Sequence, residues 1–151
     1  MARSIAAGIL IIIGIGATAC SEESDVKAVR AIVENVRVVA ERKDFDRVIE
    51  QVTDDYTDNT GNKKQTLKPR LERMFGIYDR LEIRAAISKI EKAGNSARAL
   101  AKVKVDGFRG SQKERLFGSP FAARDLQIDF EKRGGDWKIV GSSLVSRRGL
   151  F

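Results

Sequence analysis

The apolar positions of the chain divide it into a helical first half and a strand-rich second half. Over residues 26–43, apolar side chains recur three and four residues apart, which is the spacing of one helix face. The same spacing continues over residues 44–58 and 66–79, where Pro69 falls in a first turn that tolerates its missing N–H. The pattern therefore predicts three helices before the strands begin.

From residue 81 onward, apolar and polar residues alternate, which is typical of half-buried strands. The alternation breaks between Ile87 and Ile90, and such a break predicts a β-bulge that bends the sheet. We expect residues 109–123 to form a loop, or two strand ends with an insertion. The four predicted strands cover residues 81–93, 97–108, 125–132 and 137–145.

One face of these strands is predicted to be apolar and to lie under the helices. The fold class is then α+β, with three N-terminal helices packed on a curved antiparallel four-stranded sheet. In the last strand, the pattern places Gly141 and Ser143 on the inner face and Val140 and Leu144 on the outer face. The apolar residues of the inner face are Ile83, Ala85, Ile87, Ala97, Ala99, Ala101, Val103, Val105, Leu126, Ile128, Phe130, Trp137 and Ile139.

An uncharged apolar run, Ile5 to Ala19, precedes the only cysteine of the chain, Cys20. The run has 15 residues, fewer than the roughly 20 that cross a bilayer, and Arg3 supplies the positive start of a secretory signal. The small residues before Cys20 resemble the lipobox of bacterial lipoproteins, although Ala17 stands where leucine is usual. The alternative is an ordinary secretory signal.

The lipobox resemblance implies that the signal peptide 1–19 is removed and that Cys20 carries lipid. Residues 20–25 then form a polar, lipidated tether, and 26–151 form one folded domain. The membrane is the partner implied by the lipid, and the chain faces the periplasm. Ser21 follows the cysteine in place of an aspartate, which by resemblance to enterobacterial lipoprotein sorting favours the outer membrane.

The composition excludes several kinds of chemistry. The chain has no histidine and one cysteine, which rules out Ser-His-Asp and Cys-His catalysis and histidine-ligated zinc. We expect no metal and no cofactor. The net charge is +7, but the cations are spread out and not interleaved with aromatic residues, so we expect no nucleic-acid partner. A solvated basic surface or an anionic lipid or polymer accounts for the charge.

Three stretches carry a resemblance to the nuclear-transport-factor-2-like superfamily, which includes ketosteroid isomerases and polyketide cyclases. They are "DDYTDNTGNKKQTLKPRLERMF", "ISKIEKAGNSARALAKVKVDG" and "DFEKRGGDWKIVGSSL". The resemblance implies a cone whose curved sheet encloses a pocket. Catalytic members place carboxylates on the inner strand face, whereas the inner face predicted here carries none.

The predicted ligand-binding residues are aromatic or lie in the acidic run of residues 54–58. Tyr56 and Asp58 are placed at the end of the second helix, near the expected pocket mouth, where a polar helix end is the simpler interpretation. Phe45, Phe75, Tyr78 and Trp137 are candidates to line an apolar pocket, or simply to fill the core. No residue is assigned as catalytic.

Three functions follow as hypotheses. The first is an envelope lipoprotein that binds a small apolar ligand or a protein without catalysis. The second is an enzyme that uses Asp and Tyr acid–base chemistry inside the cone. The third is a structural or assembly subunit that forms a homodimer through the outer sheet face, with Leu100, Val140 and Leu144 as the contacts.

Overall fold

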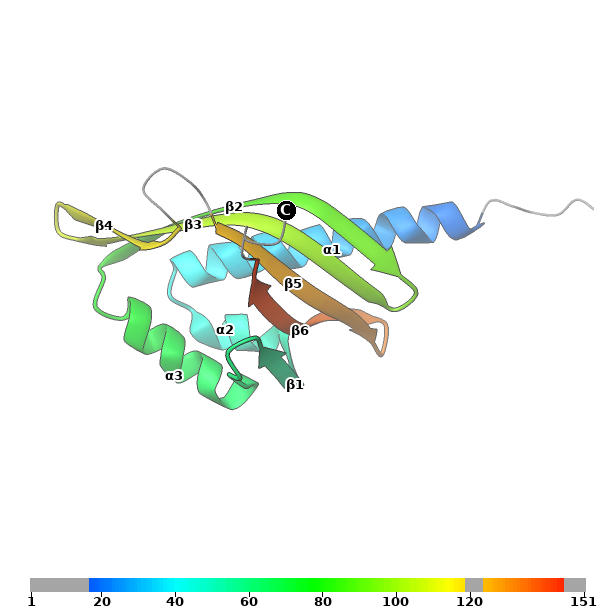
Figure 1. Ribbon diagram of the computed structural model, residues 1–151, viewed down its shortest axis with the longest axis horizontal. Coiled ribbons are helices and arrows are strands. Elements are labelled where there is room, and N and C mark those ends of the chain that lie inside the picture. The colour runs from blue at the N-terminus through cyan, green and yellow to red at the C-terminus, as the bar shows by residue number, and fades with distance from the viewer. Residues whose placement is uncertain (1–16, 119–123, 146–151) are drawn as a thin grey trace, which may run out of the picture.

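A computed structural model describes residues 17–118 and 124–145 of the chain. Helix α1 runs lengthwise beneath the long, arched strands β2 and β3, and the shorter elements gather at one end of the molecule (Figure 1). The elements are α1 (Ala17–Glu41), α2 (Phe45–Glu50), β1 (Val52–Asp58), α3 (Lys64–Phe75), β2 (Arg80–Ala93), β3 (Ser96–Arg109), β4 (Gln112–Phe117), β5 (Arg124–Arg133) and β6 (Asp136–Leu144).

The sheet of the described residues has six strands, so the prediction of a four-stranded sheet is wrong in number. The strand order is β1-β6-β5-β3-β2, and β4 pairs with β3. The β1–β6 pair is parallel and all the others are antiparallel, which makes the sheet mixed. Strands β4 and β5 both pair with β3, along successive parts of its length. Residues 109–123 were expected to be a loop or two strand ends with an insertion; the described part of this segment instead holds a separate strand, β4, which pairs back on β3.

The helix predicted over residues 44–58 is wrong in its second half, because α2 ends at Glu50 and β1 begins at Val52. Apolar residues at 48, 52 and 56 are four apart, a spacing that suits both a helix face and alternate positions of a strand. Valine, threonine and tyrosine favour strands, and pairing with β6 gives β1 a place in the sheet. Tyr56 is consequently buried on β1 and does not stand at a helix end.

Register shifts interrupt four of the strand pairs, and the two in β2 and β6 bear on the predicted strand faces. The predicted bulge in β2 is confirmed, and Ser88 is the extra residue between the pairs made by Ile87 and Lys89. A second bulge, not predicted, makes Val140 the extra residue of β6. One extra residue reverses the faces of everything that follows it.

The face assignments at the end of β6 are therefore corrected. Ser142 pairs with Ile128 and Leu144 pairs with Leu126, both inner-face residues, so Leu144 belongs to the inner side. Gly141 and Ser143 turn to the outer side. The outer-face contact set proposed for a homodimer loses Leu144 for this reason.

Helix α1 supplies the cover of the concave sheet face. Val29, Val33 and Val39 are buried against it, as the helical spacing predicts. Residues 20–25, expected to form a polar tether, belong to α1 and are helical. The signal segment 1–16 lies outside the described residues, as do 119–123 and 146–151. Among the described residues, no helix is long and apolar enough to cross a membrane.

Candidate functional site

An apolar cavity of about 120 Å³ lies between α1 and the concave face of the sheet. Helix α1 contributes four lining residues, and strands β2, β3, β5 and β6 contribute the rest. The lining consists of Val33, Val36, Arg37, Ala40, Ile83, Ala85, Ala101, Val103, Leu126, Ile128 and Ile139. Ten of these eleven residues are apolar, so the cavity is suited to a hydrophobic group.

Small side chains leave this space open. Ala101 is fully buried at the middle of β3, and Ala85 and Ala40 line the cavity from β2 and α1. Engineered apolar cavities of about 150 Å³ stay dry and accept benzene. The cavity is of the same order, and a group the size of a benzene ring is the largest that it is expected to hold.

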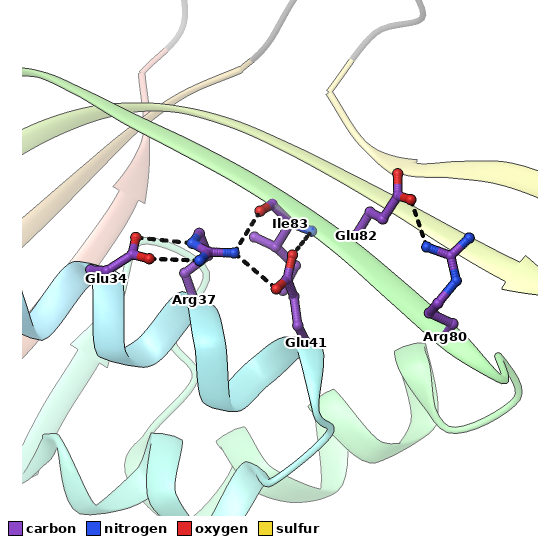
Figure 2. Close-up of polar contacts among 6 residues, drawn as sticks. All are labelled: Glu34, Arg37, Glu41, Arg80, Glu82 and Ile83. Carbon is purple, nitrogen blue, oxygen red and sulfur yellow. Dashed lines mark hydrogen bonds and ion pairs between the residues drawn. The ribbon is translucent and has the colours of Figure 1, made fainter.

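Arg37 is the only ionisable residue among the eleven that line the cavity. Figure 2 shows its polar contacts. Its Nη2 and Nε donate to the Glu34 carboxylate at 2.6 and 2.9 Å, and its Nη1 donates to Glu41 Oε2 at 2.8 Å. These contacts, led by the hydrogen bond to Glu34, raise the pKa of Arg37 above its already high value. A permanently protonated guanidinium cannot serve as a general base, so this lining offers no acid–base pair.

The same cluster ties α1 to the outermost strand of the sheet. Glu41 Oε1 accepts the Ile83 N–H at 2.7 Å, and Arg37 Nη1 donates to the Ile83 carbonyl at 3.4 Å. Strand β2 lies at the end of the strand order, so these two side chains take the place of a neighbouring strand at Ile83. In Figure 2, Arg37 and Glu41 extend from α1 to β2, and the Arg80–Glu82 pair lies on the same strand, nearer its start.

The cluster was missed at the level of sequence, although its signal is present there. Glu34 and Glu41 stand three residues before and four residues after Arg37 on one helix, and both spacings bring side chains together. Helical ion pairs of this kind are common on exposed surfaces. Only the contact with Ile83 places this one at the border of a cavity.

The two polar candidates occupy different environments. Tyr56 is buried, and its hydroxyl lies 2.8 Å from Ser142 Oγ; burial raises the pKa of Tyr56. Asp58 accepts the N–H groups of Thr60 and Asn62, at 2.8 and 2.9 Å, and so organises the turn after β1. Burial would raise the pKa of Asp58, but the hydrogen bonds from Asn62 and Thr60 outweigh it and lower the pKa.

The four aromatic candidates are buried but lie outside the cavity lining. Phe45 and Phe75 contact each other between α2 and α3, with ring centroids 6.3 Å apart. Tyr78 donates to Glu114 Oε2 at 2.7 Å, and this bond raises the pKa of the phenol. Tyr78 lines a polar surface groove next to β4. Trp137 belongs to the core beside Ile139. The structure thus distributes the six candidates over several places.

Asp25 connects α1 to the sheet at the point where the helix begins to pack against it. Its Oδ1 accepts from Lys132 Nζ at 2.8 Å and from Trp137 Nε1 at 2.9 Å, and Lys92 Nζ lies 3.2 Å from Oδ2. These partners, Lys132 first, lower the pKa of Asp25 to about 2. Three sheet strands are joined to the helix by this one carboxylate.

We expect the contribution of Asp25 to stability to disappear in acid. Its folded-state pKa of about 2 lies below the ordinary 3.8, so the contribution is complete above about pH 4 and is lost as the pH falls towards 2. The change Asp25→Asn should flatten the fall in melting temperature between pH 4 and pH 2, measured by circular dichroism. Asp136→Asn, an exposed aspartate, is the control and should keep the wild-type slope. An Asp25→Asn protein with that same slope would contradict the assignment.

Comparisons with known proteins identify the fold. No family model and no curated protein matches the sequence. Among solved structures, an NTF2-like protein with a cystatin-like fold from Novosphingobium aromaticivorans aligns with a TM-score of 0.69 at 12% identity, covering 89% of both chains. An NTF2-like protein from Pseudomonas putida gives 0.62 at 17%, covering 84% of this chain and 87% of its own. A protein with a cystatin-like fold from Nostoc punctiforme gives 0.60 at 14%, covering 80% and 89%.

These likenesses confirm the fold that the sequence resemblance implied. The chain has the nuclear-transport-factor-2-like cone, with a curved, unclosed, mixed sheet. At such identities the likeness concerns the fold alone, and this fold carries many unrelated activities. The function has to be argued from the cavity and its surroundings.

Proposed function

We propose that this chain is a lipid-anchored envelope protein whose folded domain binds a small apolar molecule without transforming it. The observation that carries the proposal is the apolar cavity under α1. Its lining supplies hydrophobic contact on all the elements that enclose it, and its single charged residue is held by two carboxylates. Such a lining suits binding better than proton transfer, because a general acid or base has to reach the reacting atom.

The enzyme hypothesis has less support from the same geometry. Its two residues were Tyr56 and Asp58, and the first faces Ser142 while the second holds a turn. Neither belongs to the cavity lining. A small ligand placed in the cavity would therefore meet neither of the two side chains assigned to the chemistry.

Benzene is a direct probe of the cavity. We expect benzene to raise the melting temperature of the purified full-length protein, because a ligand that binds only the folded state stabilises it. The change Ala101→Leu places three more carbon atoms where the cavity is, so it should abolish the benzene-induced shift. Differential scanning calorimetry with and without benzene measures both effects.

The matched control is Ala31→Leu, which adds the same atoms on the exposed side of α1. This variant should keep the full benzene-induced shift. If benzene shifts the Ala101→Leu protein as much as the wild type, the cavity is not the binding site. If benzene has no effect on the wild type, the proposal fails.

A further inference from the structure

The start of α1 and two hairpin turns lie at one end of the molecule. The β2–β3 turn consists of residues 94–95, and the β5–β6 turn consists of residues 134–135. Figure 1 shows both turns near the first part of α1, whereas α3 and β4 lie at the opposite end. We call the start of α1 together with these two turns the hairpin end. It contains Cys20, the residue to which the proposed function assigns the lipid.

Asp25 fixes the position of α1 relative to both turns. Its carboxylate accepts hydrogen bonds from Lys132 and Trp137, and Lys92 Nζ lies 3.2 Å from its Oδ2. Lys92 and Lys132 each stand two residues before a turn, and Trp137 stands two residues after one. Movement of the turns relative to the helix would therefore break these three contacts.

Cys20 and the two turns extend about equally far beyond Asp25. Helix α1 is unbroken from Ala17 to Glu41, and at about 1.5 Å per residue Cys20 lies about 7.5 Å along it from Asp25. A strand advances about 3.3 Å per residue, so each turn begins about 7 Å beyond the lysine that contacts Asp25. Because all three point to the same end of the molecule, a membrane that meets Cys20 also meets the turns.

Helix α1 is not suited to lie flat in a membrane surface. A helix that lies there needs a free apolar face. The apolar side chains of Val29, Val33 and Val39 are buried against the sheet, and residues 21–24 are exposed and polar. A lipid on Cys20 would consequently hold the helix by its end.

The surface at the two turns is compatible with zwitterionic headgroups. Residues 94–95 and 134–135 are all exposed and uncharged. Behind the turns, Lys92 and Lys132 form ion pairs with Asp25. The charges of these lysines are thus balanced within the protein, and phosphatidylcholine is a sufficient partner for this surface.

We propose that the hairpin end is the surface of the domain that contacts the phospholipid headgroups, and that α1 holds both turns against them beside the lipid on Cys20. This inference rests on the lipid anchor of the proposed function and adds to it the face that meets the membrane. Val33, the first residue of α1 in the cavity lining, lies about 20 Å along the helix from Cys20. The cavity is then held away from the headgroups.

Fluorescent labels at three exposed positions test this orientation. The lipidated protein is purified from membranes and reconstituted into phosphatidylcholine vesicles, with nitrobenzoxadiazole attached to Asn95→Cys, Asp136→Cys or Ser111→Cys. Cys20 does not react, because its sulfur carries lipid. Ser111 follows the far end of the 14-residue strand β3, roughly 40 Å from Asn95. Phosphatidylcholine with a spin-labelled headgroup should quench the labels at 95 and 136 strongly, and the label at 111 should keep its emission.

A flexible insertion tests whether α1 sets the orientation. Twelve glycine and serine residues inserted between Ser24 and Asp25 leave Cys20 in place and have an end-to-end distance of about 20 Å. Quenching of the label at Asn95→Cys should then fall towards the level seen at Ser111→Cys. The matched control carries the same insertion in the β3–β4 turn, after Gly110, and should keep the full quenching at Asn95→Cys.

The other outcomes overturn the inference. Equal quenching at Asn95→Cys and Ser111→Cys, in a protein that stays bound to the vesicles, would show that the hairpin end does not face the membrane, while the lipid anchor would stand. Quenching at Asn95→Cys that survives the flexible insertion would show that α1 does not hold the turns there. A protein that does not sediment with the vesicles would remove the lipid anchor and this inference with it, and would leave the benzene experiment unaffected.

Discussion

Replacement of Trp137 by alanine is expected to cost the domain about 3–5 kcal/mol of unfolding free energy. Trp137 is 5% exposed in the core cluster that joins α1 to the sheet. Its ring is lost in the variant, and its N–H no longer reaches Asp25. A domain of this size has a total stability of about 5–15 kcal/mol, so the variant should be close to unfolding at physiological temperature.

The measurement is urea unfolding followed by circular dichroism, because Trp137 is the only tryptophan and its fluorescence disappears with the change. Trp137→Phe keeps an aromatic ring and loses the hydrogen bond, so its destabilisation should be clearly smaller than that of Trp137→Ala. A Trp137→Ala protein within a degree or two of the wild-type melting temperature would contradict the core assignment.

The second large effect is expected at Cys20, whose replacement by serine should abolish lipid attachment completely. A thioether to lipid needs the cysteine sulfur, which a serine hydroxyl does not supply. Two acyl signals hold a protein stably at a bilayer, whereas one holds it only marginally. Cells given a labelled fatty acid should transfer the label to the wild type and not to Cys20→Ser, and mass spectrometry of the N-terminal peptide should show the same difference.

Ser21→Ala serves as the control, since it changes the neighbouring residue and leaves the sulfur in place. Labelling of the Cys20→Ser chain at the wild-type level would remove the lipoprotein part of the proposed function. That result would leave the cavity untouched, because its lining residues come from the domain and not from the N-terminal segment.

The strands of the second half could be predicted because their burial follows simple alternation. Ala97, Ala99 and Ala101 are buried and Arg98 and Lys102 are exposed, as a two-residue period requires. The β2 bulge could also be predicted from the sequence, because it interrupts the two-residue alternation of an otherwise regular segment. The local pattern is sufficient to predict a strand wherever one of its faces is buried and the other is exposed to solvent.

Pairing between strands that are distant in sequence determined the features of the fold that the local hydrophobic pattern did not predict. Strand β1 exists because β6 offers it a partner 80 or more residues away in sequence, and its own spacing also fits a helix. Alternation places Asp106 on the same strand face as the exposed Lys102, but Asp106 is buried, and Arg115 and Lys113 of β4 form ion pairs with it. The bulge at Val140 could not be predicted from the sequence, because glycine and serine stand there in place of the apolar residues whose spacing would show the shift.

The candidate site was predicted in kind but not in its residues. An apolar concave face with small alanines was expected, and Ala85 and Ala101 do line the cavity. The aromatic candidates were chosen as large hydrophobic residues, and such residues fill cores more readily than they enclose empty space. Arg37 was overlooked because its meaning depends on Ile83, which is 46 residues away.

The contact of α1 with the outer strand also bears on self-association. A strand at the end of a sheet presents unpaired backbone groups that can template pairing with another chain. At Ile83 both groups are already taken, the N–H by Glu41 and the carbonyl by Arg37. A second molecule that adds a strand at Ile83 has to displace two charged side chains first, so α1 opposes strand addition at this point of the edge.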